Sequence, residues 1–142
     1  MTICCIGSGN MGTALMKGAA SAAGSVDIGF TDIDSAKAKA AAASLKVKIL
    51  SSNSKAVEEG DYVFLAVKPQ ILKEVLEEIA PAVKKRLANV TLVSMAPGWS
   101  IEKIQNILQV KAPVIRIMPN TPSLISRGVI VMSPSRKCLR KK

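Results

Sequence analysis

The chain begins with Thr2-Ile3-Cys4-Cys5-Ile6, which is followed at once by Gly7-Ser8-Gly9-Asn10-Met11-Gly12. The first run is short, apolar and partly β-branched, a pattern typical of a buried parallel strand. The second run fits G-x-G-x-x-G, in which Gly7 permits a tight turn, Gly9 lets the backbone approach a diphosphate, and Gly12 allows close packing of the next helix. Because the motif lies between a predicted strand and a predicted helix, the stretch predicts a dinucleotide-binding loop with the diphosphate at the helix N-terminus.

Length and composition predict one folded domain. At 142 residues, of which 49% are hydrophobic, the chain can bury a sizeable core and is too apolar to be disordered. Its longest apolar runs are too short to cross a bilayer, and no basic segment precedes the first strand. We therefore expect neither a membrane span nor a signal peptide.

Cysteine and histidine usage narrows the chemistry. The three cysteines lack the spacing of metal ligands, and the adjacent Cys4 and Cys5 should point to opposite faces of a sheet. The chain has no histidine, which removes Ser-His and Cys-His nucleophiles. We therefore expect a reduced, cytoplasmic protein without a metal site.

The positive charge is concentrated at the C-terminal end. Residues 1–133 carry 15 Lys and Arg against 10 Asp and Glu, whereas residues 134–142 add five basic residues and no acid. This short segment therefore supplies half of the net charge of +10. A basic segment can bind nucleic acid or an anionic membrane, but no aromatic residue interleaves these charges to stack on bases. We predict a domain at 1–133 and a solvated basic tail at 134–142, with neither nucleic acid nor membrane as a partner.

Strand-like and helix-like patterns alternate along the rest of the chain. The predicted strands are 2–6, 26–31, 47–50, 62–67, 89–95, 114–118 and 128–132. The predicted helices are 11–23, 35–45, a short one that ends at Glu59, one that begins near Pro69 and buries Ile71, and one that follows Ser100. We expect Asn53 or Ser54 to cap the third helix and Pro81 to break or kink the fourth. The alternation predicts an α/β fold with a doubly wound parallel sheet.

Ligands of such sheets bind outside the carboxyl ends of the strands. The loops at that edge are 7–12, 32–34, 51–54, 66–69, 95–98 and 118–122. Asp32 lies 20 residues after Gly12, where a carboxylate can accept hydrogen bonds from both hydroxyls of an adenosine ribose; a helix cap or turn residue is the alternative. Asp32 alone favours NAD over NADP because it repels a 2′-phosphate, but Lys37 and Lys39 can offset it, so the choice stays open.

The loops at this edge hold few groups for acid–base chemistry. Lys68 is the strongest candidate, and its fixed charge can equally hold a ribose hydroxyl, a phosphate or a substrate carboxylate. Such a site suits hydride transfer, because a nicotinamide coenzyme carries the difficult chemistry and the protein mainly orients it. The pattern assigns no catalytic residue.

Three segments together resemble one enzyme family. They are Ile6-Gly7-Ser8-Gly9-Asn10-Met11-Gly12-Thr13-Ala14-Leu15, Phe64-Leu65-Ala66-Val67-Lys68-Pro69-Gln70 and Arg116-Ile117-Met118-Pro119-Asn120-Thr121-Pro122. In order and spacing they resemble pyrroline-5-carboxylate reductase, the last enzyme of proline synthesis, over residues 1 to about 133. The resemblance implies a Rossmann-like NAD(P)-binding domain and the NADPH- or NADH-dependent reduction of 1-pyrroline-5-carboxylate, a cyclic imine, to proline.

The resemblance also implies roles for individual residues. It places Gly7, Ser8, Gly9, Asn10, Met11 and Gly12 on the pyrophosphate, Asp32 and Asn53 near the adenosine ribose, Ala66, Val67, Lys68 and Pro69 on the nicotinamide side, and the loop of Met118, Pro119, Asn120 and Thr121 beside the nicotinamide. The 66–69 and 118–122 motifs lie at the ligand edge, which favours function over a structural role. For Asn53, a structural role as a helix cap is equally supported.

Two features depart from the family pattern. Members of the family, which are dimeric or larger, continue into an all-helical C-terminal domain that dimerises and supplies much of the imine pocket. Nothing here corresponds to that domain, and residues 134–142 lack helical periodicity. Pro97 also stands where the family more often has a small residue.

Three hypotheses from different classes are therefore open. The first is the reductase, the second is a dinucleotide-binding module without catalysis, and the third is a protein that binds nucleic acid or a membrane surface through its basic end. A β-hydroxyacid dehydrogenase-like reductase is a further enzyme alternative, but its catalytic lysine would lie in the same helical part.

Overall fold

The computed structural model describes residues 1–22, 26–120, 122 and 127–139. Its elements, in chain order, are β1 (Thr2–Ile6), α1 (Asn10–Ala22), β2 (Asp27–Thr31), α2 (Ser35–Leu45), β3 (Lys48–Ile49), α3 (Asn53–Glu59), β4 (Tyr62–Leu65), α4 (Leu72–Lys85), β5 (Thr91–Ser94), α5 (Ile101–Leu108), β6 (Val114–Met118), β7 (Val131–Pro134) and α6 (Arg136–Leu139). None of these helices combines the length and the apolar character that crossing a bilayer requires.

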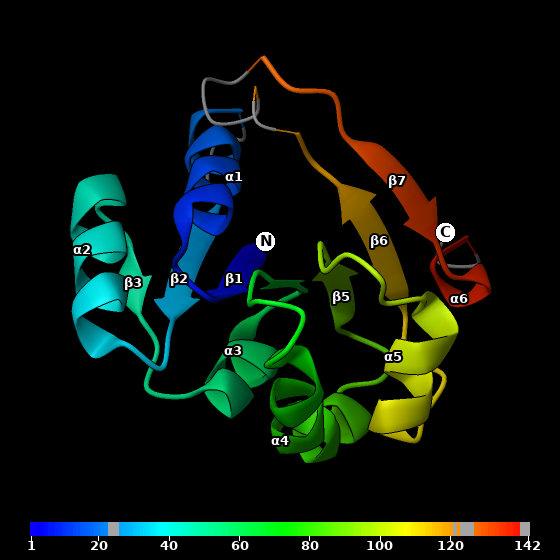
Figure 1. Cartoon of the computed structure of the whole chain (residues 1–142). Coiled ribbons are helices and arrows are strands. Elements are labelled where there is room, and N and C mark those ends of the chain that lie inside the picture. The colour runs from blue at the N-terminus through cyan, green and yellow to red at the C-terminus, as the bar shows by residue number, and fades with distance from the viewer. Residues whose placement is uncertain (23–25, 121, 123–126, 140–142) are drawn as a thin grey trace.

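The seven strands form one sheet, with β1 near its centre (Figure 1). Their order is β3-β2-β1-β4-β5-β6-β7, and every neighbouring pair from β3 to β6 is parallel. The chain leaves β1 towards β2 and β3, and later continues on the other side of β1 with β4. In such doubly wound sheets the ligand crevice lies where the strand order reverses, here between β1 and β4. The predicted fold class is confirmed.

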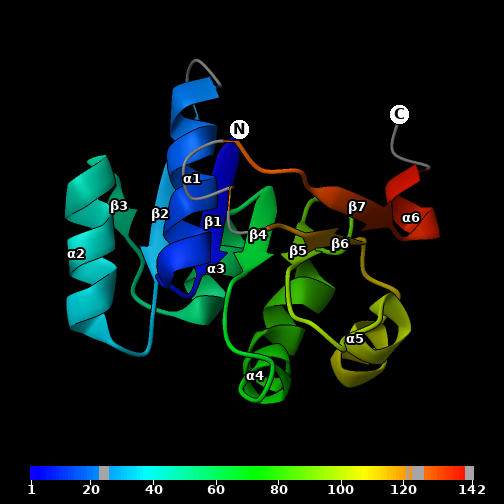
Figure 2. The ribbon, with the colours of Figure 1, turned by 45° about the horizontal axis from the view of Figure 1, so that its top comes forward.

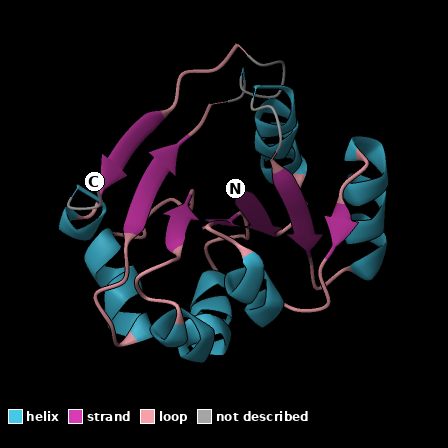
Figure 3. Ribbon diagram, turned by 180° about the vertical axis from the view of Figure 1, so that it is seen from behind, coloured by secondary structure: helices cyan, strands magenta, loops and turns pink. Residues whose placement is uncertain are grey.

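The last strand departs from the predicted alternation. β7 pairs with β6 in the antiparallel direction, with Ile117 opposite Met132 (Figure 3). A parallel neighbour needs a crossover segment, usually a helix, and the described part of the connection between β6 and β7 contains no α-helix. The prediction of a wholly parallel sheet is therefore wrong at this edge, and the strand spans 131–134 instead of 128–132.

The segment after β7 begins folded against the sheet. Ser135 is buried; its N–H donates to Val114 O at 2.7 Å and its hydroxyl accepts from Val114 N at 3.0 Å. The short helix α6 follows directly. Residues 140–142, the end of the predicted basic tail, lie outside the described residues.

The two faces of the sheet carry different helices. α1 and α2 pack on one face, and α3, α4 and α5 pack on the other (Figure 2). Cys5 lies in one core with Phe30 and Met16, whereas Cys4 lies in the opposite core with Leu65. Adjacent residues of β1 thus serve both cores, as the predicted strand requires.

Part of the α1 face of the sheet is left open. Between α1 and β7, a cavity of about 510 Å³ reaches β4, β5 and β6. Its lining is almost entirely apolar and includes Leu15, Tyr62, Phe64, Val93, Ile117 and Met132. The described helices lie over other strands of this face or on the opposite face, so this half of the sheet is covered on one side only.

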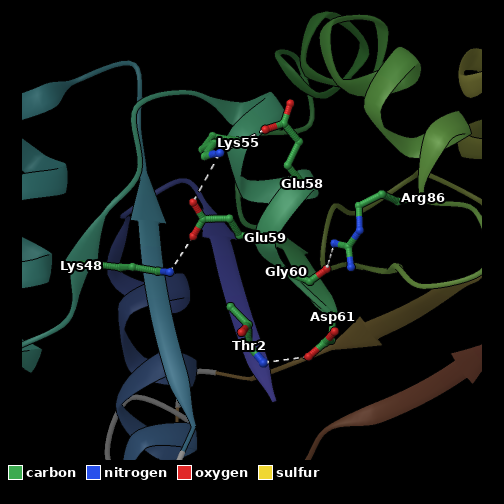
Figure 4. A network of polar contacts seen from close by, with 8 residues as sticks. All are labelled: Thr2, Lys48, Lys55, Glu58, Glu59, Gly60, Asp61 and Arg86. Carbon is green, nitrogen blue, oxygen red and sulfur yellow. Dashed lines mark hydrogen bonds and ion pairs between the residues drawn. The ribbon is translucent and has the colours of Figure 1, made fainter.

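Polar contacts fasten the amino ends of the strands, on the edge opposite the glycine loop (Figure 4). Thr2 N donates to Asp61 Oδ2 at 2.8 Å. Arg86 Nη1 donates to the carbonyl oxygens of Val57 and Gly60 at 2.7 and 2.6 Å, which ties the end of α4 to the end of α3. The surface ion pairs at this edge are Lys48–Glu59, Lys55–Glu58 and Lys55–Glu59.

The start of the third helix corrects one local prediction. α3 is capped by Ser52, whose hydroxyl accepts from Lys55 N at 3.0 Å, and not by Asn53 or Ser54. Because Ser52 has extended backbone angles, its side chain can reach back to the first turn of the helix. Asn53 is the first residue inside the helix.

The region around α4 corrects two more predictions. β4 ends at Leu65 and residues 69–71 form a turn, so Ile71 precedes the helix and is 36% exposed instead of buried. Pro81 lies inside α4 without ending it. The buried neighbours Ala80, Ala82 and Val83 hold this part of the helix in the core, and their packing outweighs the one backbone hydrogen bond that proline cannot make.

Candidate functional site

Gly7 forms the turn between β1 and α1. Its N–H donates to Thr31 O at 2.8 Å, and Ala66 N donates to Ile6 O at 2.8 Å, so the start of the loop is held between β2 and β4. Gly7 has a φ of +100°, and a Cβ there would lie 2.5 Å from the carbonyl oxygen of Ala66. Both facts require glycine, as the tight turn of the motif predicts.

Gly12 and Gly9 have different surroundings. A Cβ on Gly12 would lie 2.8 Å from Ala66 Cβ and 3.2 Å from Cys5 Sγ, so this glycine lets α1 pack closely against the strand ends. A Cβ on Gly9 would meet nothing within 4 Å. The backbone at Gly9 therefore faces open space, which is what a diphosphate needs in order to approach the loop.

The N-terminus of α1 opens beside Gly9. The helix begins at Asn10 and has no acidic residue in its first turn. In the part of the chain that the structure describes, no side chain accepts from its first N–H groups, whereas Asp34, Ser52 and Ser100 cap α2, α3 and α5. The unused N–H groups and the positive end of the helix dipole favour an anionic ligand here.

Asp32 fastens the glycine loop to the end of β2. Its Oδ2 accepts from the N–H and the hydroxyl of Ser8, both at 2.7 Å, and its Oδ1 accepts from Asp34 N at 2.9 Å. Burial raises the pKa of this carboxyl, but the hydrogen bonds from Asp34 and Ser8 together outweigh burial and hold the pKa below its ordinary value of 3.8. Asp32 is therefore ionised at neutral pH.

Asp34 occupies the start of α2. Its Oδ1 accepts from Ala36 N at 3.0 Å and from Lys37 N at 3.2 Å, which makes Asp34 the helix cap and leaves Asp32 to the loop. Lys37 Nζ lies 3.9 Å from Asp34 Oδ2. The turn between β2 and α2 thus carries two carboxylates, and a lysine follows in the first turn of α2.

A cavity of about 590 Å³ extends from the glycine loop to α3 and α4. Asp32, Asn53 and Lys68 line it. Asn53 Nδ2 donates to Glu78 Oε2 at 2.8 Å, so this side chain is held against α4. The apolar part of the lining includes Ile33, Ile71 and Val75. The cavity therefore offers both polar and apolar contacts to a ligand.

A second cavity of about 360 Å³ lies at the ends of β5 and β6. Gly9 and residues 66–68 line both cavities, so the two adjoin at the glycine loop. In the part of the chain that the structure describes, the lining of the second cavity includes two cations, Lys68 and Arg116, and no acid. An anionic group is therefore favoured in this part of the site.

Trp99 ties two of the loops together. Its side chain is buried, and its Nε1 donates to Pro69 O at 3.1 Å. Lys103 Nζ lies 4.3 Å from the centroid of its ring. Gly98, with a φ of +75°, turns the backbone immediately before it. As a result, the 95–98 loop, which contains Pro97, is held against the 66–69 loop.

The structure brings most of the predicted site residues to the two cavities. Gly7, Gly9, Asp32, Asn53, Ala66, Val67 and Lys68 line the first, and Gly9, Asn10, Met11, Gly12, Ala66, Val67, Lys68, Met118 and Pro119 line the second. Ser8 is buried and bonds to Asp32, and Pro69 offers its carbonyl oxygen to Trp99. Asn120 is exposed, and its Oδ1 accepts from Val129 N at 3.2 Å. Thr121 lies outside the described residues.

Sequence reasoning missed Arg116 as a lining residue and Trp99 as a link between loops. Arg116 had a detectable signal, because it is a charged residue in a strand between the buried Val114 and Ile117. Trp99 had none, since its partner is a backbone carbonyl 30 residues away in the chain.

The fold and the open glycine loop define a Rossmann-like dinucleotide-binding domain. Residues 2–98 match the family described as "NADP oxidoreductase coenzyme F420-dependent". The chain belongs to this family.

Individual relatives are pyrroline-5-carboxylate reductases, which confirms the resemblance predicted from the motifs. The chain is 35% identical over 136 residues to the one from Corynebacterium melassecola, an overlap of 95% of this chain and 50% of the relative. It is also 35% identical over 124 residues to the one from Pseudomonas aeruginosa, covering 87% of this chain and 44% of the relative. The chain thus spans about half the length of these curated relatives.

Solved structures of pyrroline-5-carboxylate reductases are also similar to this chain. A pyrroline-5-carboxylate reductase from Coxiella burnetii matches with a TM-score of 0.83 at 28% identity, over 94% of this chain and 49% of that one. The pyrroline carboxylate reductase of Plasmodium falciparum, solved with NADP bound, matches with a TM-score of 0.75 at 24% identity, over 96% of this chain and 48% of that one. Because its sequence identity is low, the second match supports only the similarity of the fold.

Proposed function

We propose that the protein takes part in reducing 1-pyrroline-5-carboxylate to proline, with NADPH or NADH as the hydride donor. The observation that carries the proposal is the open backbone at Gly9, where a Cβ would meet nothing within 4 Å, between two cavities that adjoin at the loop. The relatives that carry the name of this enzyme support the choice of substrate.

The described residues fit a dinucleotide. Gly9 and the N–H groups at the start of α1 would hold the pyrophosphate, and Asp32 and Asn53 would face the adenosine ribose in the first cavity. Residues 66–68 would border the nicotinamide, where the cavities adjoin. When bound, the coenzyme supplies the hydride, so the chain has to bind it and orient it.

The second cavity suits a small anionic imine. Lys68 and Arg116 line it with no acid among the described lining residues, and their charges would attract the substrate carboxylate. The imine carbon accepts a hydride while the C=N double bond becomes a single bond, and the nitrogen, protonated beforehand as an iminium, becomes the amine. The reaction therefore does not require a strong acid from the chain, which agrees with the few acid–base groups at this edge.

A dinucleotide-binding module without turnover is the second candidate. Among the described residues, Lys68 and Arg116 are the only titratable ones that line the second cavity. The relatives are about twice as long as this chain, so further residues can complete a substrate pocket in them. In this case the chain would bind the coenzyme and leave the imine unchanged.

The proposal extends to the organisation of the protein. We keep the domain predicted at 1–133, followed by the basic segment 134–142, whose first residues complete β7 and pack against β6 instead of forming a solvated tail. We also propose a small-molecule substrate in place of nucleic acid or membrane. A cytoplasmic location is included because it would keep the free thiols of Cys4 and Cys5 reduced.

Equilibrium titration with NADH and NADPH, followed through the fluorescence of Trp99, tests coenzyme binding. Trp99 is the only tryptophan and bonds to Pro69 O beside Lys68, so its emission should change when the site fills. Gly9→Ala is expected to weaken both coenzymes by about tenfold or more, because the new methyl group faces the pyrophosphate. Gly18→Ala, whose Cβ also meets nothing within 4 Å, is the matched control.

Incubation of the same samples with the cyclic imine separates the two candidates. Coenzyme oxidation that depends on the imine, with proline as the product, supports the reductase. Coenzyme binding without turnover supports the binding module. Binding of neither coenzyme contradicts both candidates.

A further inference from the structure

We propose that this chain selects NADH over NADPH, because two of its own carboxylates occupy the turn where a 2′-phosphate would bind. This inference rests on the proposed function, since it concerns the same coenzyme site. The turn comprises residues 32–34, between β2 and α2, and lines the cavity of about 590 Å³. An acidic residue at this position receives the ribose hydroxyls of NAD in related folds, whereas a basic residue nearby accommodates the phosphate of NADP.

Four N–H groups around the turn, those of Ser8, Asp34, Ala36 and Lys37, are already used inside the chain. Asp32 accepts from Ser8 N at 2.7 Å and from Asp34 N at 2.9 Å. Asp34 in turn accepts from Ala36 N at 3.0 Å and from Lys37 N at 3.2 Å. A 2′-phosphate would need such donors, and to gain any of these four it would have to displace a hydrogen bond to a carboxylate.

The charge around the first cavity also disfavours a 2′-phosphate. The acids that line it are Asp32, Asp34, Glu74 and Glu78, and the lysines are Lys37 and Lys68. Lys37 is partly neutralised, because its Nζ lies 3.9 Å from Asp34 Oδ2, and Lys68 lies where the two cavities adjoin. A 2′-phosphate, with a charge of roughly −1.5 to −2, would therefore enter a region with an excess of negative charge.

Asp32 keeps capacity for a ribose. An ionised carboxylate has about four acceptor sites, and three of those on Asp32 are occupied by Ser8 and Asp34. Its Oδ1 can accept one further hydrogen bond, which a ribose hydroxyl of NADH can donate. The turn thus accommodates the hydroxyl and disfavours the phosphate.

Titration of the full chain with each coenzyme tests the inference directly. NADH is expected to bind tighter than NADPH by about tenfold or more. Asp34→Ser keeps a helix-capping side chain and removes one negative charge, so NADPH should gain about threefold to tenfold in affinity while NADH changes little. Glu102→Gln, at the start of α5 and outside the cavity lining, changes the net charge equally and should leave the affinity ratio unchanged.

A second variant covers the case in which Asp34→Ser does not fold. Lys37→Ala removes the lysine whose Nζ lies 3.9 Å from Asp34 Oδ2 and should widen the preference for NADH, whereas Lys39→Ala, exposed on the same helix, should not. Circular dichroism establishes that each variant is folded.

The outcomes separate this inference from the function on which it rests. Equal affinity for the two coenzymes, or tighter binding of NADPH, would overturn the NADH preference and leave the coenzyme site in place. A ratio that is unchanged in the folded turn variants, or shifted as much by Glu102→Gln as by Asp34→Ser, would also overturn it. Binding of neither coenzyme would contradict the proposed function together with this inference.

Discussion

Gly7 and Gly9 belong to one motif, but the fold requires glycine only at Gly7, whereas Gly9 faces open space. A Cβ on Gly7 would lie 2.5 Å from a backbone oxygen at a φ of +100°, so Gly7→Ala should lower the free energy of unfolding by about 2 kcal/mol or more. Gly9→Ala adds its methyl group to open space and should change stability by no more than about 0.5 kcal/mol. Urea denaturation of both variants measures the difference. Equal losses in the two would show that Gly9 has a structural role as well.

Asp32 should make stability depend on pH in acid. Its pKa in the folded chain lies below the ordinary value of 3.8, so the folded state favours the ionised form. The resulting stabilisation is fully present well above pH 3.8 and is lost as the pH falls through the folded-state pKa. The difference in unfolding free energy between wild type and Asp32→Asn should therefore shrink from neutral pH towards acid. Denaturation curves along a pH series measure it, and a difference that grows towards acid would contradict the assignment.

The three cysteines should differ in reactivity. Burial raises the pKa of Cys4 to about 11, and burial likewise raises the pKa of Cys5 far above its ordinary range. Cys138 is only partly buried. A thiol reagent such as DTNB should therefore modify one thiol in the native protein and the other two only after unfolding. Modification of more than one thiol without loss of structure would show that β1 is more accessible than the packing indicates.

Arg86 joins two helices at the edge of the sheet away from the coenzyme site. Its Nη1 donates to the carbonyl oxygen of Gly60 (Figure 4) and to that of Val57, so Arg86→Met leaves two acceptors without their charged donor. Stability should fall by about 2 kcal/mol, since hydrogen bonds to charged groups contribute about 1.5–3 kcal/mol. Chemical denaturation measures the loss, with Lys85→Met, an exposed neighbour, as the control. Equal effects of the two substitutions would argue against the helix link.

The sequence predicts well those elements whose conformation is determined by residues adjacent in the chain. β1, the glycine loop and α1 follow from adjacent residues, and both Gly7 and Gly12 meet the close contacts that the motif predicts. Pro81 shows the limit of such reasoning, because packing of the surrounding α4 residues overrides a local helix breaker. The direction of β7 depends on how the chain returns after β6, and the link between Trp99 and Pro69 joins segments distant in sequence. Neither has a local pattern.

At the scale of the whole molecule, the sheet is protected unevenly. Its α3–α5 face is covered along β1, β4, β5 and β6, whereas the opposite face is open between α1 and β7. β7 is also an edge strand, and all four of its residues are exposed. An apolar face beside an edge strand with free backbone groups is a surface on which protein chains associate.

Met132 allows this to be tested, because it is 62% exposed, lies in β7 and lines the open apolar cavity. We expect the wild-type chain to self-associate as its concentration rises, and Met132→Lys to reduce this by placing a charge on both the edge and the open face. The free energy of unfolding should change by no more than about 0.5 kcal/mol, since an exposed side chain is replaced. Ile49→Lys, 50% exposed in the opposite edge strand β3, is the control and should have little effect. Sedimentation velocity over a concentration series measures association, and a wild-type chain that stays monomeric throughout would show that the open face does not drive assembly.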